Sequence, residues 1–169
     1  ACRTCVCTCV KPGTRHQQMC KAGHMDNDDL FICIDHVGLA VHNLDDAIEF
    51  HTKVMGWRVL HRETNEEQGV EEAMIGTGEQ LSQNAQIQLL APLTEESTIA
   101  KFISRNGPGM QQLAYRVKDL DHVIATLKER GVRLLFPEPK RGTAGSRINF
   151  CHPKDTGGVL LELVEPATH

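Results

Sequence analysis

The protein has 169 residues, a formal net charge of −4 and a sequence pI near 6.1, and only 4% of its residues are aromatic. It therefore has neither the basic surface nor the stacking side chains that nucleic-acid binding requires. No apolar run approaches the ~20 residues that cross a bilayer, so we expect no membrane partner. The length suits one domain, or two small modules that share a core.

Residues 1–25 are expected to be a leader that is disordered or non-native and contributes nothing to fold or activity. Five of the seven cysteines lie in it: Cys2, Cys5, Cys7, Cys9 and Cys20. Its Cys-x-x-Cys pair near His16 also offers soft metal ligands, and its basic residues without acidic ones also fit an organellar transit peptide. Gly23-His24-Met25 resembles a cloning scar, and we favour a cytoplasmic protein over one of the mitochondrial matrix. Only Cys33 and Cys151 remain, so the body of the chain is not a disulfide scaffold.

The first module, residues 26–95, reads as βαβββ. An apolar strand is predicted for residues 30–41, and Asn43 is a good N-cap for a helix that Gly56 ends. Further strands are predicted for residues 57–61, 70–75 and 85–90, with a charged loop at 62–69.

A linker helix is predicted within residues 96–109, with Thr94 or Ser97 as its cap. Ile99, Phe102 and Ile103 would lie on one side of it. The sequence Asn-Gly-Pro-Gly at 106–109 ends this segment.

The second module, residues 110–166, repeats the first, since residues 110–117 have the same pattern of apolar and polar residues as residues 34–41, at an offset of 76 positions. Asp119 caps a helix that runs to Arg130, and an apolar strand follows at 131–135. A long loop precedes a strand at 148–150, and Asp-Thr-Gly-Gly at 155–158 signals a hairpin before the last strand.

The repeat pairs four polar residues in otherwise apolar strands: His36 corresponds to Gln112, and Gln88 corresponds to Glu162. Each can face inward, because side chains alternate along a strand. A buried polar residue without a partner costs roughly 1–3 kcal/mol. A shared cation would satisfy all four, and imidazole, carboxylate and amide oxygens suit Co, Mn, Ni, Fe or Zn.

The loop at 136–147 is partly basic, with Lys140, Arg141 and Arg147. Its glycines admit close backbone approach, so it can hold an anionic ligand such as a phosphate-bearing cofactor. The alternative is an ordinary solvated loop.

Several segments resemble the methylmalonyl-CoA epimerases of the vicinal oxygen chelate superfamily, over residues 26 to 165. They are residues 28–37, 65–70, 90–93, 96–98, 147–150 and 152–163, in the family's order and spacing. The resemblance implies an α+β fold in which two tandem βαβββ modules form a cupped mixed β-sheet with helices outside. It also implies a homodimer.

The resemblance assigns roles to single residues. It implies that His36, Gln88, Gln112 and Glu162 bind a divalent metal, with cobalt expected first and Mn, Ni, Zn or Fe as alternatives. It implies a proton-transfer base at Glu72, whereas alternation alone leaves Glu71 and Glu72 open. One departure is Gln111-Gln112, where the family has two histidines.

The implied reaction removes a proton that lies between a thioester and a carboxylate. The resulting enolate needs a nearby cation, and inversion needs an acid–base group on each face, for which Glu72 and Glu162 fit. The substrate is then an acyl-CoA, with Lys140, Arg141, Arg147 and Lys154 as its expected contacts. The alternatives are another enzyme of the superfamily, such as a glyoxalase-like lyase, and a ligand-binding relative with an impaired metal site.

Overall fold

The computed structural model describes residues 30–81 and 84–167, so the predicted leader lies outside the described residues. Eight strands form one curled sheet in the order β2-β3-β4-β1-β5-β8-β7-β6. The strands are β1 (Phe31–Ala40), β2 (Arg58–Asn65), β3 (Val70–Gly76), β4 (Gln86–Pro92), β5 (Gly109–Val117), β6 (Lys140–Arg141), β7 (Arg147–Cys151) and β8 (Leu161–Glu165). The expected cupped sheet of two βαβββ modules is therefore confirmed.

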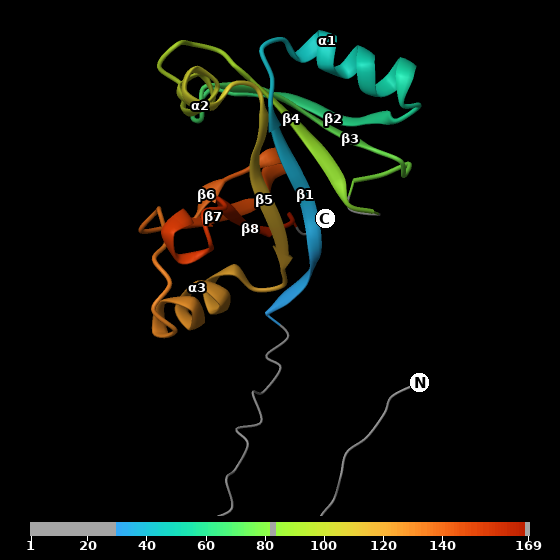
Figure 1. Cartoon of the computed structure of the whole chain (residues 1–169). Helices are drawn as coiled ribbons and strands as arrows, with labels where there is room; N and C mark the ends of the chain where they lie inside the picture. Colours follow the sequence, from blue (N-terminus) through green and yellow to red (C-terminus); the bar gives the residue numbers. More distant parts are fainter. Residues whose placement is uncertain (1–29, 82–83, 168–169) are drawn as a thin grey trace, which may run out of the picture.

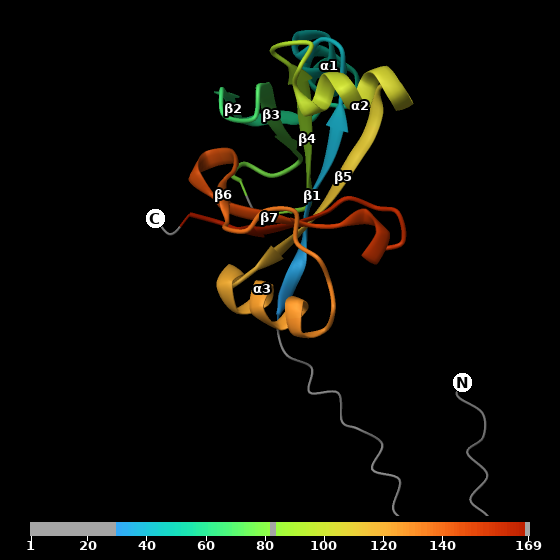
Figure 2. The same ribbon diagram turned by 90° about the vertical axis from the view of Figure 1, so that its left-hand side faces the viewer.

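The helices are short and lie outside the sheet (Figures 1 and 2). They are α1 (Leu44–Glu49), which continues as the π-helix η1 (Phe50–Val54), then α2 (Thr98–Asn106) and α3 (Leu120–Glu129), with 3₁₀ turns η2 (Thr143–Gly145) and η3 (Pro153–Asp155). No helix in residues 30–81 and 84–167 is long and apolar enough to cross a membrane.

The long strands β1 and β5 run side by side through the middle of the molecule and join its two halves (Figure 1). They pair antiparallel, whereas β1 pairs parallel with β4, and β5 pairs parallel with β8. The first and last strands of each module are therefore neighbours. Because of this topology, polar residues from four strands meet at one place on the inner face.

Apolar side chains on the outer face hold each half together. In the first half, Leu44 of α1 packs with Ala73, Ile75 and Leu89 of the strands. In the second half, α3 contributes Leu120, Val123 and Ile124, which pack with Leu163 and Val117. Leu30, at the start of β1, joins this second cluster, so the two halves share apolar packing as well as hydrogen bonds.

The predicted helix caps are confirmed. Asn43 Oδ1 accepts a hydrogen bond from the Asp46 amide at 3.0 Å, and Asp119 Oδ1 accepts one from the His122 amide at 2.9 Å. Of the two candidates for α2, the cap is Ser97, whose Oγ accepts from the Ala100 amide at 3.0 Å. These side chains satisfy amides that the first turn of a helix leaves free.

Two strand predictions were wrong. Residues 131–135 make only an isolated bridge, between Leu134 and Cys151, and the edge strand is β6 instead. The His152 amide donates to the Arg133 carbonyl and the Leu135 amide to the Phe150 carbonyl, both at 2.8 Å, which makes this bridge. The next amide, that of Phe136, donates to the Asn149 side chain at 3.2 Å, so the ladder does not continue. The first half of the expected charged loop at 62–69 is strand, because β2 continues to Asn65, and residues 66–69 form a turn. The inner face of β2 lines a polar site, so it lacks the apolar alternation that marks a strand.

Candidate active site

The four polar residues of the repeat lie together inside the curled sheet. His36 comes from β1, Gln88 from β4, Gln112 from β5 and Glu162 from β8, and each is at most 6% exposed. His36 Nε2 lies 3.2 Å from Glu162 Oε2, and Gln112 Nε2 donates to Gln88 Oε1 at 3.1 Å and also to Glu162 Oε2. The four residues that we predict to bind a metal therefore lie next to one another in the structure.

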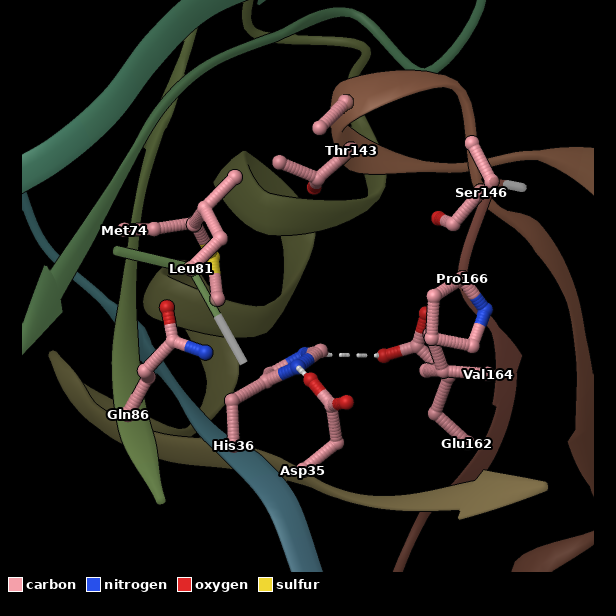
Figure 3. Close-up of a pocket in the computed structure, with 12 residues that line it drawn as sticks. Asp35, His36, Met74, Leu81, Gln86, Thr143, Ser146, Glu162, Val164 and Pro166 are labelled. Atoms are coloured by element: carbon pink, nitrogen blue, oxygen red, sulfur yellow. Dashed lines mark hydrogen bonds and ion pairs between the residues drawn. The ribbon is translucent and has the colours of Figure 1, made fainter. Parts of the chain in front are cut away.

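His36 is oriented by a buried carboxylate on its other ring nitrogen. Its Nδ1 lies 2.9 Å from Asp35 Oδ1, and Arg116 Nε donates to Asp35 Oδ2 at 2.6 Å. A carboxylate accepts only, so Nδ1 carries a hydrogen, and Nε2 is the ring nitrogen that faces Glu162. Figure 3 shows His36 between Asp35 and Glu162.

This donor set fits a divalent metal. His36 Nε2 has no hydrogen bond of good geometry among the described residues, although the Glu162 carboxylate is near it. Burial alone lowers the pKa of His36, but the neighbouring carboxylates of Asp35 and Glu162 raise it to about 9. An imidazole that attracts a proton so strongly, beside a carboxylate and two amides, is a place where a cation is stabilised.

Gln112 is packed against the backbone of β1. Gly38 pairs with Gln88 on one side and with Gln112 on the other. A Cβ at Gly38 would lie 2.5 Å from Gln112 Cγ, so only glycine leaves room for this side chain in its present position. Gln112 would offer its Oε1 to a cation once its amide is rotated by half a turn.

Glu72 faces the same site from β3 and is 2% exposed. Its Oε1 accepts from Thr143 Oγ1 at 2.9 Å, and its Oε2 accepts from Gln88 Nε2 at 2.9 Å. Glu71 points the other way, toward Arg62 at 3.4 Å, so the structure decides which of the two glutamates is inside. Burial raises the pKa of Glu72 to about 7; the Thr143 hydrogen bond opposes this and the neighbouring Glu63 adds to it.

Sequence reasoning missed two polar residues on β2, His61 and Glu63. Glu63 is the cross-strand partner of Glu72, so the two side chains share one face of the sheet. His61 Nε2 lies 2.7 Å from Glu63 Oε2. The sequence did contain a signal for them: His61 and Glu63 are two residues apart, and residues at that spacing lie on the same face of a strand.

Two cavities open on the site and share Thr143 and Glu162. The smaller, of about 270 Å³, is bordered by His36, Met74 and Pro166 (Figure 3). The larger, of about 390 Å³, is lined by both glutamates, Glu72 and Glu162, together with Gln88, Gln112 and Gln111.

Of the four expected substrate contacts, Lys140 lines the larger cavity, where its Nζ lies 2.8 Å from Glu67. Arg141 is adjacent to it and exposed. Arg147 forms ion pairs with Asp121 and Glu165, at 2.8 and 2.7 Å, and Lys154 is exposed in η3. Neither Arg147 nor Lys154 lines either cavity.

Residues 35–150 match the model of the Glyoxalase/Bleomycin resistance protein/Dioxygenase superfamily. The chain belongs to this superfamily. A member from Mycobacterium tuberculosis, a methylmalonyl-CoA epimerase of known structure, is 52% identical with a TM-score of 0.79, over 86% of this chain and 95% of that one. A methylmalonyl-CoA epimerase solved with methylmalonyl-CoA and NH4+ is 43% identical with a TM-score of 0.75, over 82% and 96% of the two chains. The ethylmalonyl-CoA/methylmalonyl-CoA epimerase of Cereibacter sphaeroides is 36% identical, over 77% of this chain and 95% of its own length.

Proposed function

We infer that the protein is an isomerase that interconverts (R)- and (S)-methylmalonyl-CoA. One observation carries this beyond the likeness to epimerases: two buried glutamates, Glu72 and Glu162, come from opposite halves of the sheet and line one cavity. Gln88 and Gln112 connect them by hydrogen bonds. Inversion at a carbon needs an acid–base group on each of its faces, and this pair supplies two.

The reaction begins when one glutamate takes the α-proton, and the electron pair passes into the thioester to give an enolate. The other glutamate then returns a proton to the opposite face of the carbon. Both carboxyls are almost fully buried, so bulk water does not compete with them for the enolate. The amide of Gln88 is placed to hold the Glu72 carboxylate in a fixed direction.

We propose a divalent metal held by His36, Gln88, Gln112 and Glu162, with cobalt first and Mn, Ni, Zn or Fe as alternatives. When bound, it would act as a Lewis acid that stabilises negative charge on the substrate oxygens. The support from the chain itself is the buried His36 Nε2, which has no hydrogen bond of good geometry among the described residues and lies 3.2 Å from the Glu162 carboxylate.

We propose that the larger cavity holds the acyl-CoA, with Lys140 and Arg141 as phosphate contacts near its rim. Arg147 and Lys154 stay predictions of the sequence, and Arg147 would first have to leave its ion pairs. As the resemblance implies, we propose a homodimer that works in the cytoplasm. Light scattering after size-exclusion chromatography tests the assembly.

The decisive experiment follows the α-proton in deuterated water by NMR, with metal-depleted protein to which cobalt is added. Conversion of one methylmalonyl-CoA isomer to the other, with deuterium at the α-carbon, supports the epimerase. Turnover of a glutathione hemithioacetal instead would support a glyoxalase-like lyase. Binding of the acyl-CoA with neither reaction would favour the ligand-binding relative, which Gln112 in place of the family histidine motivates.

A further inference from the structure

Two successive contacts connect the proposed metal ligand His36 to Arg116 on β5. His36 Nδ1 lies 2.9 Å from Asp35 Oδ1 (Figure 3), and Arg116 Nε donates to Asp35 Oδ2 at 2.6 Å. Asp35 is 5% exposed, and the Arg116 side chain is 13% exposed. The Asp35 carboxylate is therefore fixed at both of its oxygens, at one by the imidazole and at the other by the guanidinium.

A β-bulge in β1 explains how two adjacent residues reach the same face. Neighbouring residues of a regular strand point to opposite faces, so Asp35 would turn away from the site that His36 faces. The register between β1 and β5 shifts here: Ile34 pairs with Tyr115 and His36 with Ala114, so Asp35 is the extra residue. A bulge re-aims a side chain, and Asp35 accordingly lines the smaller cavity together with His36.

Arg116 reaches Asp35 from the other half of the molecule. Gln112, Ala114 and Arg116 occupy alternate positions of β5, so the three side chains share the inner face. The partner of Arg116 on β8 is Val164, which lines the smaller cavity. The ion pair thus connects β1 of the first module to β5 of the second, close to the place where the proposed ligands meet.

The repeat shows which part of this arrangement is specific to the first module. Asp35 corresponds to Gln111 in the second module, and Arg116 corresponds to Ala40 in the first. The register of the same two strands also shifts at Gln111, but Gln111 Oε1 has no hydrogen bond among the described residues. The bulge therefore belongs to both modules, whereas the carboxylate and its arginine support His36 alone.

We propose that Arg116 is a positioning residue of the metal site: it fixes Asp35, and Asp35 holds the His36 ring in its orientation. This rests on the proposed function, because it concerns the metal that we place at His36. A carboxylate on the far nitrogen of a metal-binding histidine sets the direction of the ring, and loss of such a partner typically lowers metal affinity about 10- to 100-fold. The carboxylate sets a direction only while it is itself held, and the guanidinium holds it.

The first test measures cobalt affinity by equilibrium dialysis of the metal-depleted full chain, without substrate. We expect Asp35→Asn to weaken cobalt binding by about 10- to 100-fold and Arg116→Gln by at least about tenfold, since both release the His36 ring. Arg116→Lys should recover part of the loss, because it keeps a cation beside Asp35. Arg62→Gln is the matched control: Arg62 also forms two ion pairs, but on the outer face of the sheet, so cobalt affinity should not change.

The second test asks whether Arg116 acts through Asp35. In the double variant Asp35→Asn/Arg116→Gln, the loss of cobalt affinity should be no larger than in Asp35→Asn alone, because no carboxylate remains for the arginine to hold. This variant also has no unpaired charge at the site of the ion pair, so we expect it to fold even if Arg116→Gln does not. Circular dichroism and Tm check the fold of each variant.

The third test reports on the ring itself. In a cobalt-loaded protein, the Nδ1 proton of a bound histidine gives a paramagnetically shifted NMR signal that disappears as the proton exchanges with solvent. We expect the His36 signal to persist in the parent protein and in Arg62→Gln, and to be lost in Asp35→Asn and Arg116→Gln. A residue that only stabilises the fold would not change this signal.

The outcomes separate the positioning role from the function on which it rests. If the parent protein binds no cobalt, the proposed metal site fails and the positioning role fails with it. If the parent binds cobalt and the Asp35 and Arg116 variants bind it equally tightly, the positioning role is wrong and the metal site stands. Losses that add in the double variant would show that Arg116 does not act through Asp35. The expected losses without epimerisation by the parent would overturn the proposed reaction and leave the positioning role in place.

Discussion

At the scale of single residues, Gln112 stands where the resemblance of the sequence to the epimerases implies a histidine. Amide oxygen is a weaker donor than imidazole for borderline metals. We expect Gln112→His to retain cobalt at least about tenfold more tightly on dialysis, or ~1.4 kcal/mol, and to exchange the α-proton faster.

The control for this variant is Gln111→His. Gln111 also borders the larger cavity, but the hydrogen bonds to Gln88 and Glu162 are made by Gln112. Equal gains in the two variants, or a gain in Gln111→His alone, would show that Gln112 is not a ligand.

Replacement of the two buried glutamates should affect metal binding differently. We expect Glu162→Gln to abolish turnover and to weaken metal binding, since Glu162 contacts His36 and Gln112. Glu72→Gln should lower kcat by about 10²- to 10⁴-fold and leave metal binding almost intact, because Glu72 acts on the proton. Parallel activity assays and metal titrations check this; two active variants with normal metal binding would refute the two-base assignment.

The raised pKa of Glu72 should be visible in stability. The folded protein holds the Glu72 proton up to a pH of about 7, whereas an ordinary glutamate releases it near 4.5. The folded state therefore binds more protons in this window, and the contribution of Glu72 to stability declines as pH rises from 4.5 to 7. Tm measured across this range should fall less steeply in Glu72→Gln than in the parent protein, and an unchanged slope would contradict the shift.

At the scale of elements, β1 supplies the proposed ligand His36 and also, at Gly38, the space that the Gln112 side chain occupies. We expect Gly38→Ala to destabilise the protein by about 1–3 kcal/mol, as overpacking does, and to weaken metal retention, because its Cβ would meet Gln112 Cγ at 2.5 Å. The control is a double-mutant cycle with Gln112→Ala, measured by chemical denaturation. In the double variant the cost of the alanine at position 38 should largely disappear; a cost that persists would place the conflict elsewhere.

Elements were predictable where local chemistry decides them. The caps Asn43, Ser97 and Asp119 and the terminating glycines, such as Gly56 with φ 70°, act within a few residues of the chain. The end of β2 and the failure of the strand at 131–135 depend on partners far away in sequence. Glu63 lies inward because it pairs with β3, and residues 131–135 make a single bridge because the Phe136 amide that follows binds the Asn149 side chain.

At the scale of the whole molecule, the two modules form one cooperative unit. β1 pairs with β4 of its own module and with β5 of the other, and Leu30 packs in the core of the second half. We expect a single unfolding transition in calorimetry, with equal calorimetric and van't Hoff enthalpies. Residues 26–95 expressed alone should not fold, since β1 would lose its β5 partner. Two resolved transitions, or a folded first half, would show that the modules are independent.

The sequence by itself determined the repeat, the βαβββ order, the cupped fold through family resemblance, and the four polar positions that the repeat pairs. The repeat, the order of elements and the four polar positions follow from periodicity and local spacing, whereas the cupped fold is what the resemblance implies. Only the tertiary structure decided that Glu72 and not Glu71 faces the site, that Gly38 makes room for Gln112, and that Glu63 lies opposite Glu72 on the neighbouring strand. The reason is physical: which face of a strand is buried, and what lies opposite it, depends on the pairing of strands that the linear order of residues does not contain.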